Sequence, residues 1–328
     1  MKAVVIPAPG GVDVLQLQDV PAPVCGPEDL LVRVRAAALN RADLLQRMGQ
    51  YPQPGPRPAI EIPGLEFAGE VLQVGDRVEG FALGERVMGL LAGGAQAEQV
   101  VIHHRLAMKV PASLSWLEAG ATPEVYITAH DALRQCDLAA GESVLVHAAG
   151  SGVGVAAIQI AKAMGASFVA GTAGSADKLE RARELGLDLG VNYREQPDFD
   201  VAVLSATANR GVDVILDVIG ASYWSRNLRA LASKGRMVLV GLMGGATTEA
   251  NLGMLLAKRA SVRGTTLRAR PLEEKAAATK AFEKSILPHM AAGRVRVIVD
   301  RVFPLSDIAE AHRYLESNAN FGKVVLEV

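Results

Sequence analysis

The sequence contains few cysteines and few aromatic residues. It has 2 Cys in 328 residues, and Phe, Trp and Tyr together make up 4%. Cys25 and Cys136 lie far apart and have no metal-ligand spacing around them, which argues against a zinc finger or a disulfide framework. A single Cys25–Cys136 disulfide remains an open alternative. So low an aromatic content also argues against a base-stacking surface for nucleic acids.

Excess charge and long apolar runs are also absent. The net charge is −1, so no general attraction to nucleic acid or anionic lipid is expected. No apolar run approaches the ~18 residues of a membrane span, and the start MKAVVIPAPGG is too short in apolar residues for a signal peptide. With 50% hydrophobic residues, the composition predicts a globular, cytoplasmic protein of about two domains, with no nucleic-acid or membrane partner.

Glycine is abundant, and its most informative cluster follows a short apolar run. The run Val144–Val146 leads into the small-residue segment 148–154, and an Ala/Ile-rich helical pattern continues to Gly165. Strand, glycine turn and helix form a phosphate-binding cradle, because free N–H groups and the helix dipole favour an anion. The alternative is a tight turn without a ligand, since two glycine slots hold other residues. The candidate cofactor residues here are Ala149, Ser151, Gly152, Val153 and Gly154.

From about Pro123 the pattern alternates between strands and helices. Strands are predicted at 143–147, 167–172, 212–217, 236–241 and 261–265, with helices at 153–164, 175–185 and 224–231. Such alternation predicts an α/β domain with a doubly wound parallel sheet, a Rossmann domain, over residues 123–265.

The remaining residues have a different pattern. Before residue 122, short strands alternate with Gly and Pro, one helix begins near Arg41, and a loop with five prolines occupies 51–63. After Pro271 a charged helical stretch precedes a strand at 294–303, a helix at 306–317 and a last strand at 323–328. Residues 1–122 and 266–328 are therefore expected to form one β-rich domain, with the last strand joining the N-terminal sheet.

The tip of the second predicted Rossmann strand indicates which nicotinamide cofactor is bound. An NAD-binding turn places an acid there for the ribose 2′-hydroxyl. This chain has Thr172, Gly174 and Ser175 at that point, and no acid. Lys178 in the next helical turn is placed to reach a 2′-phosphate, and Tyr193 to lie along the adenosine. These residues predict NADPH, although Lys178 as a solvated helix residue is the competing interpretation.

The N-terminal region contains two further motifs. Asn40-Arg41-Ala42-Asp43 has the pattern of a helix capping box, which would be a purely structural role for Asn40. Gln50-Tyr51-Pro52 follows in the proline-rich loop, and Gly64-Leu65-Glu66-Phe67-Ala68-Gly69 comes next.

Together with Thr128-Ala129, His147–Gly154, Thr172–Ser175 and the closing segment 320–326, these motifs resemble the zinc-free, zeta-crystallin-like quinone oxidoreductase branch of the medium-chain dehydrogenase/reductases. The resemblance runs over the whole chain and implies a GroES-like β-rich catalytic domain, a site in the interdomain cleft, and a homodimer with 261–265 as a contact strand. It also implies that Tyr51 bonds the quinone oxygen, with packing on prolines as the alternative, and that Asn40 shapes the pocket. The cofactor contacts it implies are Thr128, Leu242, Leu267, Phe321, Gly322 and Lys323.

Zinc-dependent members of the superfamily place a Cys near position 40 and a His before the Glu of the GxE turn. Asn40 and Leu65 occupy these slots, so no metal is expected. Relatives carry a Tyr where this chain has Gln96, which leaves the pocket lining open.

The expected function is zinc-independent hydride transfer from NADPH to a small quinone. Two alternatives remain: a zinc-free enoyl or alkenal reductase, in which Tyr51 would serve as the acid, and an NADPH-binding protein with an RNA-binding or structural role. The balanced charge and the lack of a basic-aromatic stripe argue against RNA.

Overall fold

The computed structural model describes residues 1–51, 55 and 58–328, and these residues form two compact units. The β-rich unit contains residues 1–127, 267–293 and 297–328. The parallel-sheet unit contains residues 128–266 and 294–296. Part of the loop predicted at 51–63, including Pro52 of the Gln50-Tyr51-Pro52 motif, lies outside the described residues.

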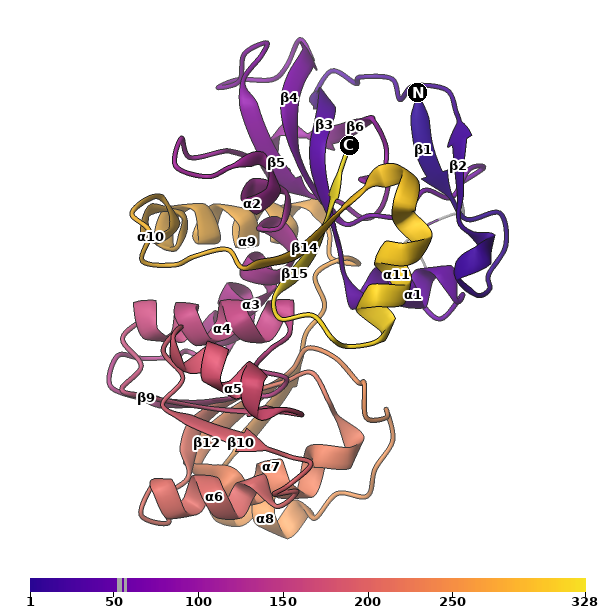
Figure 1. The fold of residues 1–328 in the computed structure, drawn as a ribbon. Helices are drawn as coiled ribbons and strands as arrows, with labels where there is room; N and C mark the ends of the chain where they lie inside the picture. The colour runs from indigo at the N-terminus through magenta and orange to yellow at the C-terminus, as the bar shows by residue number, and fades with distance from the viewer. Residues whose placement is uncertain (52–54, 56–57) are drawn as a thin grey trace. The chain divides into compact units, whose positions relative to one another are not determined.

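A seven-stranded sheet forms the centre of the β-rich unit (Figure 1). Its path runs β14 (Val299–Pro304), β15 (Lys323–Glu327), β3 (Asp29–Leu39), β4 (Glu66–Val74), β5 (Arg86–Leu90) and β7 (Ala107–Lys109), and β6 (Gln99–His103) pairs with β3. The C-terminal strand β15 pairs antiparallel with β3, with Val324 opposite Leu39. The prediction that the last strand joins the N-terminal sheet is therefore confirmed.

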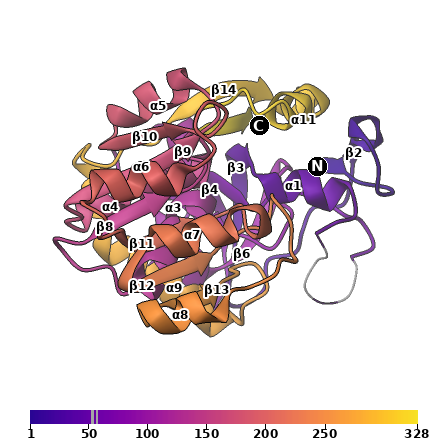
Figure 2. The ribbon, with the colours of Figure 1, turned by 90° about the horizontal axis from the view of Figure 1, so that it is seen from below.

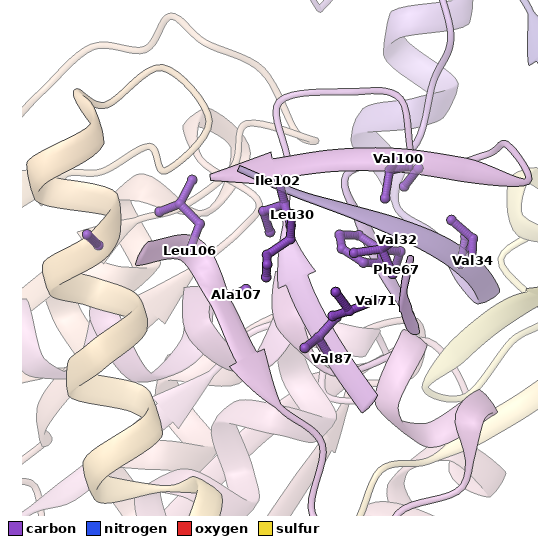
Figure 3. Close-up of a cluster of buried hydrophobic side chains, with 13 residues drawn as sticks. Leu30, Val32, Val34, Phe67, Val71, Val87, Val100, Ile102, Leu106 and Ala107 are labelled. Carbon is purple, nitrogen blue, oxygen red and sulfur yellow. The ribbon is translucent and has the colours of Figure 1, made fainter. Parts of the chain in front are cut away.

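The core of this unit follows from the two-residue period of its strands. Leu30, Val32 and Val34 alternate along β3 and are almost fully buried, because alternate side chains of a strand point to the same face. They pack with Phe67, Val71 and Val87 of the neighbouring strands (Figure 3).

Smaller elements complete the β-rich unit. β1 (Lys2–Val5) pairs with β2 (Gln16–Asp19). The helices are α1 (Arg41–Arg47), α2 (Trp116–Gly120), α9 (Leu272–Ser285), α10 (Leu287–Ala291) and α11 (Ile308–Glu316), with short 3-10 turns at Val12–Val14, His104–Leu106 and Leu305–Asp307. Leu44 of α1 and Ile308 of α11 share a buried cluster with Leu326 of β15, which fixes α1 beside the end of β3.

The parallel-sheet unit contains a six-stranded sheet of order β10-β9-β8-β11-β12-β13, in which every pairing is parallel. The strands are β8 (Ser143–Val146), β9 (Phe168–Ala173), β10 (Leu189–Asn192), β11 (Val212–Asp217), β12 (Leu231–Leu239) and β13 (Ser261–Gly264). Successive strands after β8 extend the sheet first to one side and then, from β11, to the other. Ligands bind at such a switch point, beyond the carboxyl ends of the strands.

Helices connect these parallel strands. They are α4 (Gly152–Ala163), α5 (Ala176–Arg183), α6 (Phe199–Ala206), α7 (Trp224–Ala230) and α8 (Leu252–Lys258), with a 3-10 turn at Ala221–Tyr223. The three helices predicted at 153–164, 175–185 and 224–231 correspond to α4, α5 and α7. Figure 2 shows α6, α7 and α8 side by side. Among the described residues, no helix combines the length and the apolar character that crossing a membrane requires.

Several elements differ from the sequence-based expectation. The strand predicted at 294–303 begins only at Val299, and residues 294–296 belong to the parallel-sheet unit. The helix α3 (Pro123–Gln135) was not predicted, because its consecutive buried residues Val125, Tyr126 and Ile127 hide the helical period. The helices α6 and α8 were not predicted either. Cys25 and Cys136 are both free, so the possible disulfide between them is not formed.

Candidate active site

The glycine turn after β8 has the geometry of an anion cradle. Ala148 adopts a left-handed φ of 53°, and Ser151 then caps α4, its Oγ accepting a hydrogen bond of 3.0 Å from the Gly154 N–H. A Cβ added at Gly154 would lie 2.2 Å from the Ala148 carbonyl oxygen. Only glycine therefore permits the turn to approach the helix this closely, and the remaining N–H groups at the start of α4 point towards an incoming anion.

The tip of β9 lies close to several polar side chains. A Cβ at Gly150 would meet the Lys178 side chain at 2.8 Å, and one at Gly174 would meet the Tyr193 hydroxyl at 2.6 Å. Ser175 caps α5, and its Oγ accepts a hydrogen bond of 3.4 Å from the backbone N–H of Lys178. The structure thus places Lys178 beside Gly150 and Tyr193 beside Gly174.

Sequence reasoning missed a second cation at this tip. The Arg194 Nε would lie 3.2 Å from a Cβ at Gly174, next to the Tyr193 hydroxyl. In the sequence, Arg194 directly follows Tyr193, which was already a predicted cofactor residue, and this position could have identified it. Two cations and no acid at the tip suit a 2′-phosphate better than a bare ribose hydroxyl.

A buried polar network supports the turn from below. The His147 Nδ1 lies 2.9 Å from the Thr172 hydroxyl, and its Nε2 lies 2.7 Å from the Asn227 Oδ1. Asn227 in turn donates to Asp217 at 3.0 Å. Burial lowers the pKa of His147, so the neutral ring donates to the Asn227 oxygen and accepts from Thr172. The network fixes the ends of β8, β9 and β11, and His147 has no nitrogen left for catalysis.

The remaining predicted cofactor residues lie in both units. In the parallel-sheet unit, Thr128 is half-buried on α3, and Leu242 is exposed. In the β-rich unit, Leu267 and Phe321 are buried, and Gly322 has a φ of 88° close to the Ile298 carbonyl.

Lys323, which the family resemblance implied as a cofactor contact, lies in a buried polar network. Its side chain is buried, and its ammonium group donates to the Leu39 carbonyl at 2.8 Å and the Asn40 Oδ1 at 2.6 Å. It also forms an ion pair of 2.7 Å with the Glu66 Oε1. These three acceptors match the three protons of an ammonium group. The Lys323 charge therefore holds Asn40 and Glu66 and is not free for a cofactor phosphate.

Asn40 takes part in the helix cap and also in a buried network of polar side chains. Its backbone N–H donates to the Asp43 Oδ2 at 2.7 Å, as in a capping box at the start of α1. Its carboxamide meanwhile donates to the Glu66 Oε1 at 2.9 Å and accepts from Lys323. The side chain is therefore part of a buried polar cluster.

That cluster, which we call the carboxyl cluster, consists of Asp43, Glu66 and Glu124 around Lys323. The Glu66 Oε2 accepts a hydrogen bond of 2.8 Å from the Glu124 backbone N–H. Burial raises the pKa of Asp43 to about 6, and burial together with the Glu66 charge raises the pKa of Glu124 to about 8. The sequence did not identify this cluster, because its members come from α1, β4, α3 and β15.

Tyr51 is held by an arginine that the sequence analysis also missed. The guanidinium carbon of Arg268 lies 4.7 Å from the Tyr51 ring centroid. Its Nε donates to the Ala92 carbonyl at 2.7 Å, and its Nη2 to the Gln46 Oε1 at 3.0 Å. Burial and the nearby Glu124 charge raise the pKa of the Tyr51 phenol. Tyr51 therefore contacts a cation on the face of its ring.

Gln96 is fully buried near Gly64, and neither its amide nitrogen nor its amide oxygen has a partner among the described residues. Across residues 1–51, 55 and 58–328, no group of three or more His, Cys, Asp or Glu has an arrangement that could hold a metal ion.

Comparison with known proteins identifies the superfamily to which the chain belongs. Residues 26–112 match the alcohol dehydrogenase GroES-like domain family, and residues 152–284 match the zinc-binding dehydrogenase family. The chain is 34% identical to a quinone oxidoreductase of Lama guanicoe, over 99% of this chain and 97% of that protein. The chain therefore belongs to the quinone oxidoreductase branch of the medium-chain dehydrogenase/reductase superfamily.

Solved structures agree on the fold. The quinone oxidoreductase of Escherichia coli complexed with NADPH matches with a TM-score of 0.89 at 31% identity, covering 100% of both chains. A structure described as an NAD-dependent alcohol dehydrogenase matches with a TM-score of 0.88 at 36% identity, again over 100% of both chains. The expected α/β fold with a GroES-like and a Rossmann-type domain is confirmed, and the protein is an oxidoreductase of this superfamily.

Proposed function

We propose that this protein is an NADPH-dependent quinone oxidoreductase that works without a metal ion. Metal-independent chemistry is supported most strongly by the contacts of Asn40, which lies beside the carboxyl cluster. Where zinc-dependent relatives place ligands, this chain has Asn40 and Leu65, and the Asn40 oxygen is bonded to the Lys323 ammonium. Zinc prefers thiolate and imidazole ligands. An amide oxygen that already accepts a hydrogen bond from Lys323 is a poor ligand for zinc, and a leucine side chain cannot bind it at all.

The cofactor proposal rests on the parallel-sheet unit. The small residues from Ala149 to Gly154 would hold the pyrophosphate, and Lys178, Tyr193 and Arg194 would surround the 2′-phosphate. Solved relatives divide on this point, because one is named as NAD-dependent and another is described with NADPH. The acid-free tip of β9 favours NADPH in this chain. When bound, the nicotinamide supplies the hydride for the reduction.

Residues of the β-rich unit would bind the acceptor. Tyr51 would donate a hydrogen bond to a quinone oxygen, and Asn40 would shape the polar end of the pocket. Leu267 and Phe321, which are buried in this unit, would form the apolar wall against the ring. Because quinones accept hydride readily, alignment and stabilisation of the developing oxyanion are sufficient for turnover.

The proposal is tested with EDTA-treated protein and an acceptor panel of ortho- and para-quinones, alkenals and 2-enoyl thioesters. We expect NADPH oxidation with quinones, little with the other acceptors, and no loss of activity after EDTA. Faster turnover of alkenals or enoyl thioesters would favour the reductase alternative. No turnover of any acceptor together with salt-sensitive RNA retention would favour the binding-protein alternative.

We further propose that the protein forms a homodimer through β13. This strand pairs only with β12 among the described residues and is largely exposed, so its other edge can pair with a second copy. Leu252 and Leu256 of the adjacent α8 are 65% and 78% exposed, which adds apolar area. Sedimentation equilibrium should give twice the monomer mass, and a monomer at micromolar concentration would contradict the assignment.

A further inference from the structure

Arg268 is a buried cation whose hydrogen-bond partners are all neutral. The residue is 6% exposed and lies in the segment between β13 and α9. Its Nε donates to the Ala92 carbonyl at 2.7 Å, its Nη2 to the Gln46 Oε1 at 3.0 Å, and its Nη1 to the Tyr51 carbonyl at 3.5 Å. No ion pair of Arg268 is found among the described residues. The charge of this guanidinium is therefore not neutralised by a carboxylate in direct contact.

Arg47, which is also buried in this unit, shows the usual arrangement. It is 1% exposed, forms an ion pair with Glu316 and donates to the Gly10 carbonyl at 3.2 Å. Buried charges are normally paired in this way, because neutral acceptors repay only part of the cost of leaving water. Burial accordingly lowers the pKa of Arg268. A buried guanidinium without such a pair indicates a role beyond the stability of the fold.

The guanidinium of Arg268 covers one face of the Tyr51 ring. Its carbon lies 4.7 Å from the ring centroid, which is within the range at which a cation is attracted to an aromatic face. The bond to the Tyr51 carbonyl means that Arg268 contacts both the ring and the backbone of this residue. Gln46 on α1 and Ala92 after β5 hold the guanidinium in turn. Arg268 thus links Tyr51 to two regular elements of the β-rich unit.

The hydroxyl of Tyr51 is left available by these contacts. The residue is half-buried, and no hydrogen bond of its hydroxyl is found among the described residues. Burial and the Glu124 charge raise the pKa of the phenol, whereas the Arg268 charge opposes them. A nearby cation draws electron density from the phenol and makes its O–H a stronger hydrogen-bond donor.

We propose that Arg268 is the residue that positions Tyr51 for the acceptor oxygen and strengthens it as a hydrogen-bond donor. This inference rests on the proposed function, in which hydride transfer leaves an oxyanion on the quinone and Tyr51 donates to it. A donor stabilises such an oxyanion best when its position is fixed before the reaction. Arg268 moves no proton and acts only through Tyr51, so its effect on turnover should vanish when the Tyr51 hydroxyl is absent.

A double-mutant cycle in quinone reduction tests this dependence. Arg268→Met and Tyr51→Phe should each lower kcat about 100-fold, because misplacing or removing an oriented donor costs about that much. The double variant should also lose about 100-fold, whereas independent roles would multiply to ~10,000-fold. A ~10,000-fold loss in the double variant, or an unchanged kcat in Arg268→Met, would overturn the proposal.

Arg86→Met is the matched control for loss of an arginine from an aromatic face. The Arg86 guanidinium carbon lies 4.3 Å from the Trp116 ring centroid, and its Nη2 donates to the Leu114 carbonyl at 2.7 Å. This contact has the same chemistry without Tyr51, so Arg86→Met should keep the wild-type kcat. An equal loss of kcat in Arg86→Met and Arg268→Met would show a general effect on folding and would overturn the assignment.

Arg268→Lys separates the charge from the shape of the side chain. Lysine keeps the charge but lacks the planar fork that bonds Ala92 and Gln46 together, so kcat should fall about tenfold, less than in Arg268→Met. This variant carries the test if circular dichroism shows that Arg268→Met does not fold. A wild-type kcat in Arg268→Lys would contradict positioning through the fork.

Ultraviolet titration of the tyrosines without cofactor gives a readout that does not depend on turnover. Subtracting the curve of Tyr51→Phe isolates the Tyr51 phenol. Loss of the Arg268 charge should raise the pKa of Tyr51 in Arg268→Met, and Arg268→Lys should leave it near the wild-type value. An unchanged Tyr51 curve in Arg268→Met would overturn the proposal. Absence of quinone turnover in the wild type would refute the proposed function instead, while the titration still decides whether Arg268 acts on Tyr51.

Discussion

The glycine turn after β8 and the carboxyl cluster beside α1 hold their polar groups in different ways. The turn uses backbone N–H groups and small residues from one continuous segment, and Lys178 follows within the same βαβα run. The cluster uses charged side chains from four elements, of which Asp43 and Glu66 have no exposed surface. The turn presents backbone donors at the start of a helix, whereas the carboxyl cluster consists of ionisable side chains gathered around the buried Lys323.

This difference determines how each region should respond to mutation. Removing a charge from the buried cluster leaves its partner uncompensated in a low-dielectric environment, so folding stability is affected first. Altering the turn changes the space and charge offered to a ligand, so cofactor affinity is affected first. The following substitutions compare the two regions, beginning with the largest expected effect.

Lys323→Met should be the most damaging change. It keeps the length of the side chain but leaves the buried Glu66 without its cation, which costs about 3–5 kcal/mol when one partner of a buried pair is removed. Urea unfolding at pH 7 measures the loss.

The control for this change is Lys2→Met, which breaks the exposed pair with Asp19 and should cause no measurable loss. Equal stability of the two variants would mean that Glu66 does not depend on Lys323.

Gly154→Ala should weaken cofactor binding in general. Its Cβ would lie 2.2 Å from the Ala148 carbonyl oxygen, so the turn must open. We expect NADPH and NADH to bind about 100-fold more weakly, or ~2.7 kcal/mol, as measured by nucleotide fluorescence.

Gly150→Ala is the matched control, because its Cβ meets only the side chain of Lys178, which can move. The comparison is made with NADH, which does not use Lys178; if both alanine variants bound NADH equally well, the close approach at Gly154 would not matter.

Lys178→Ala should have the smallest and most selective effect. Loss of one of the two cations at the β9 tip should weaken NADPH binding about tenfold, or ~1.4 kcal/mol, without changing NADH binding. Isothermal titration of both nucleotides separates the two cases. A parallel loss for NADH would place Lys178 at the pyrophosphate instead of the 2′-phosphate.

The two regions also differ in how far the sequence could predict them. The parallel sheet and the turn were predictable, because Val144–Gly165 contains strand, turn and helix in one stretch. The closing strand β15 was placed correctly from its position after the alternating part. The carboxyl cluster was not predictable, because Glu66 meets Lys323 and the Glu124 backbone only after β15 pairs with β3 and α3 starts beside β4. Arg268 over Tyr51 is likewise a contact across 217 residues.

The most direct test of the account is the binding of NADPH and NADH to the wild-type protein, measured as two dissociation constants in one buffer at fixed salt. The account predicts that NADPH binds at least about tenfold more tightly, because Lys178 and Arg194 lie at a strand tip without an acid. Equal dissociation constants, or tighter binding of NADH, would contradict it.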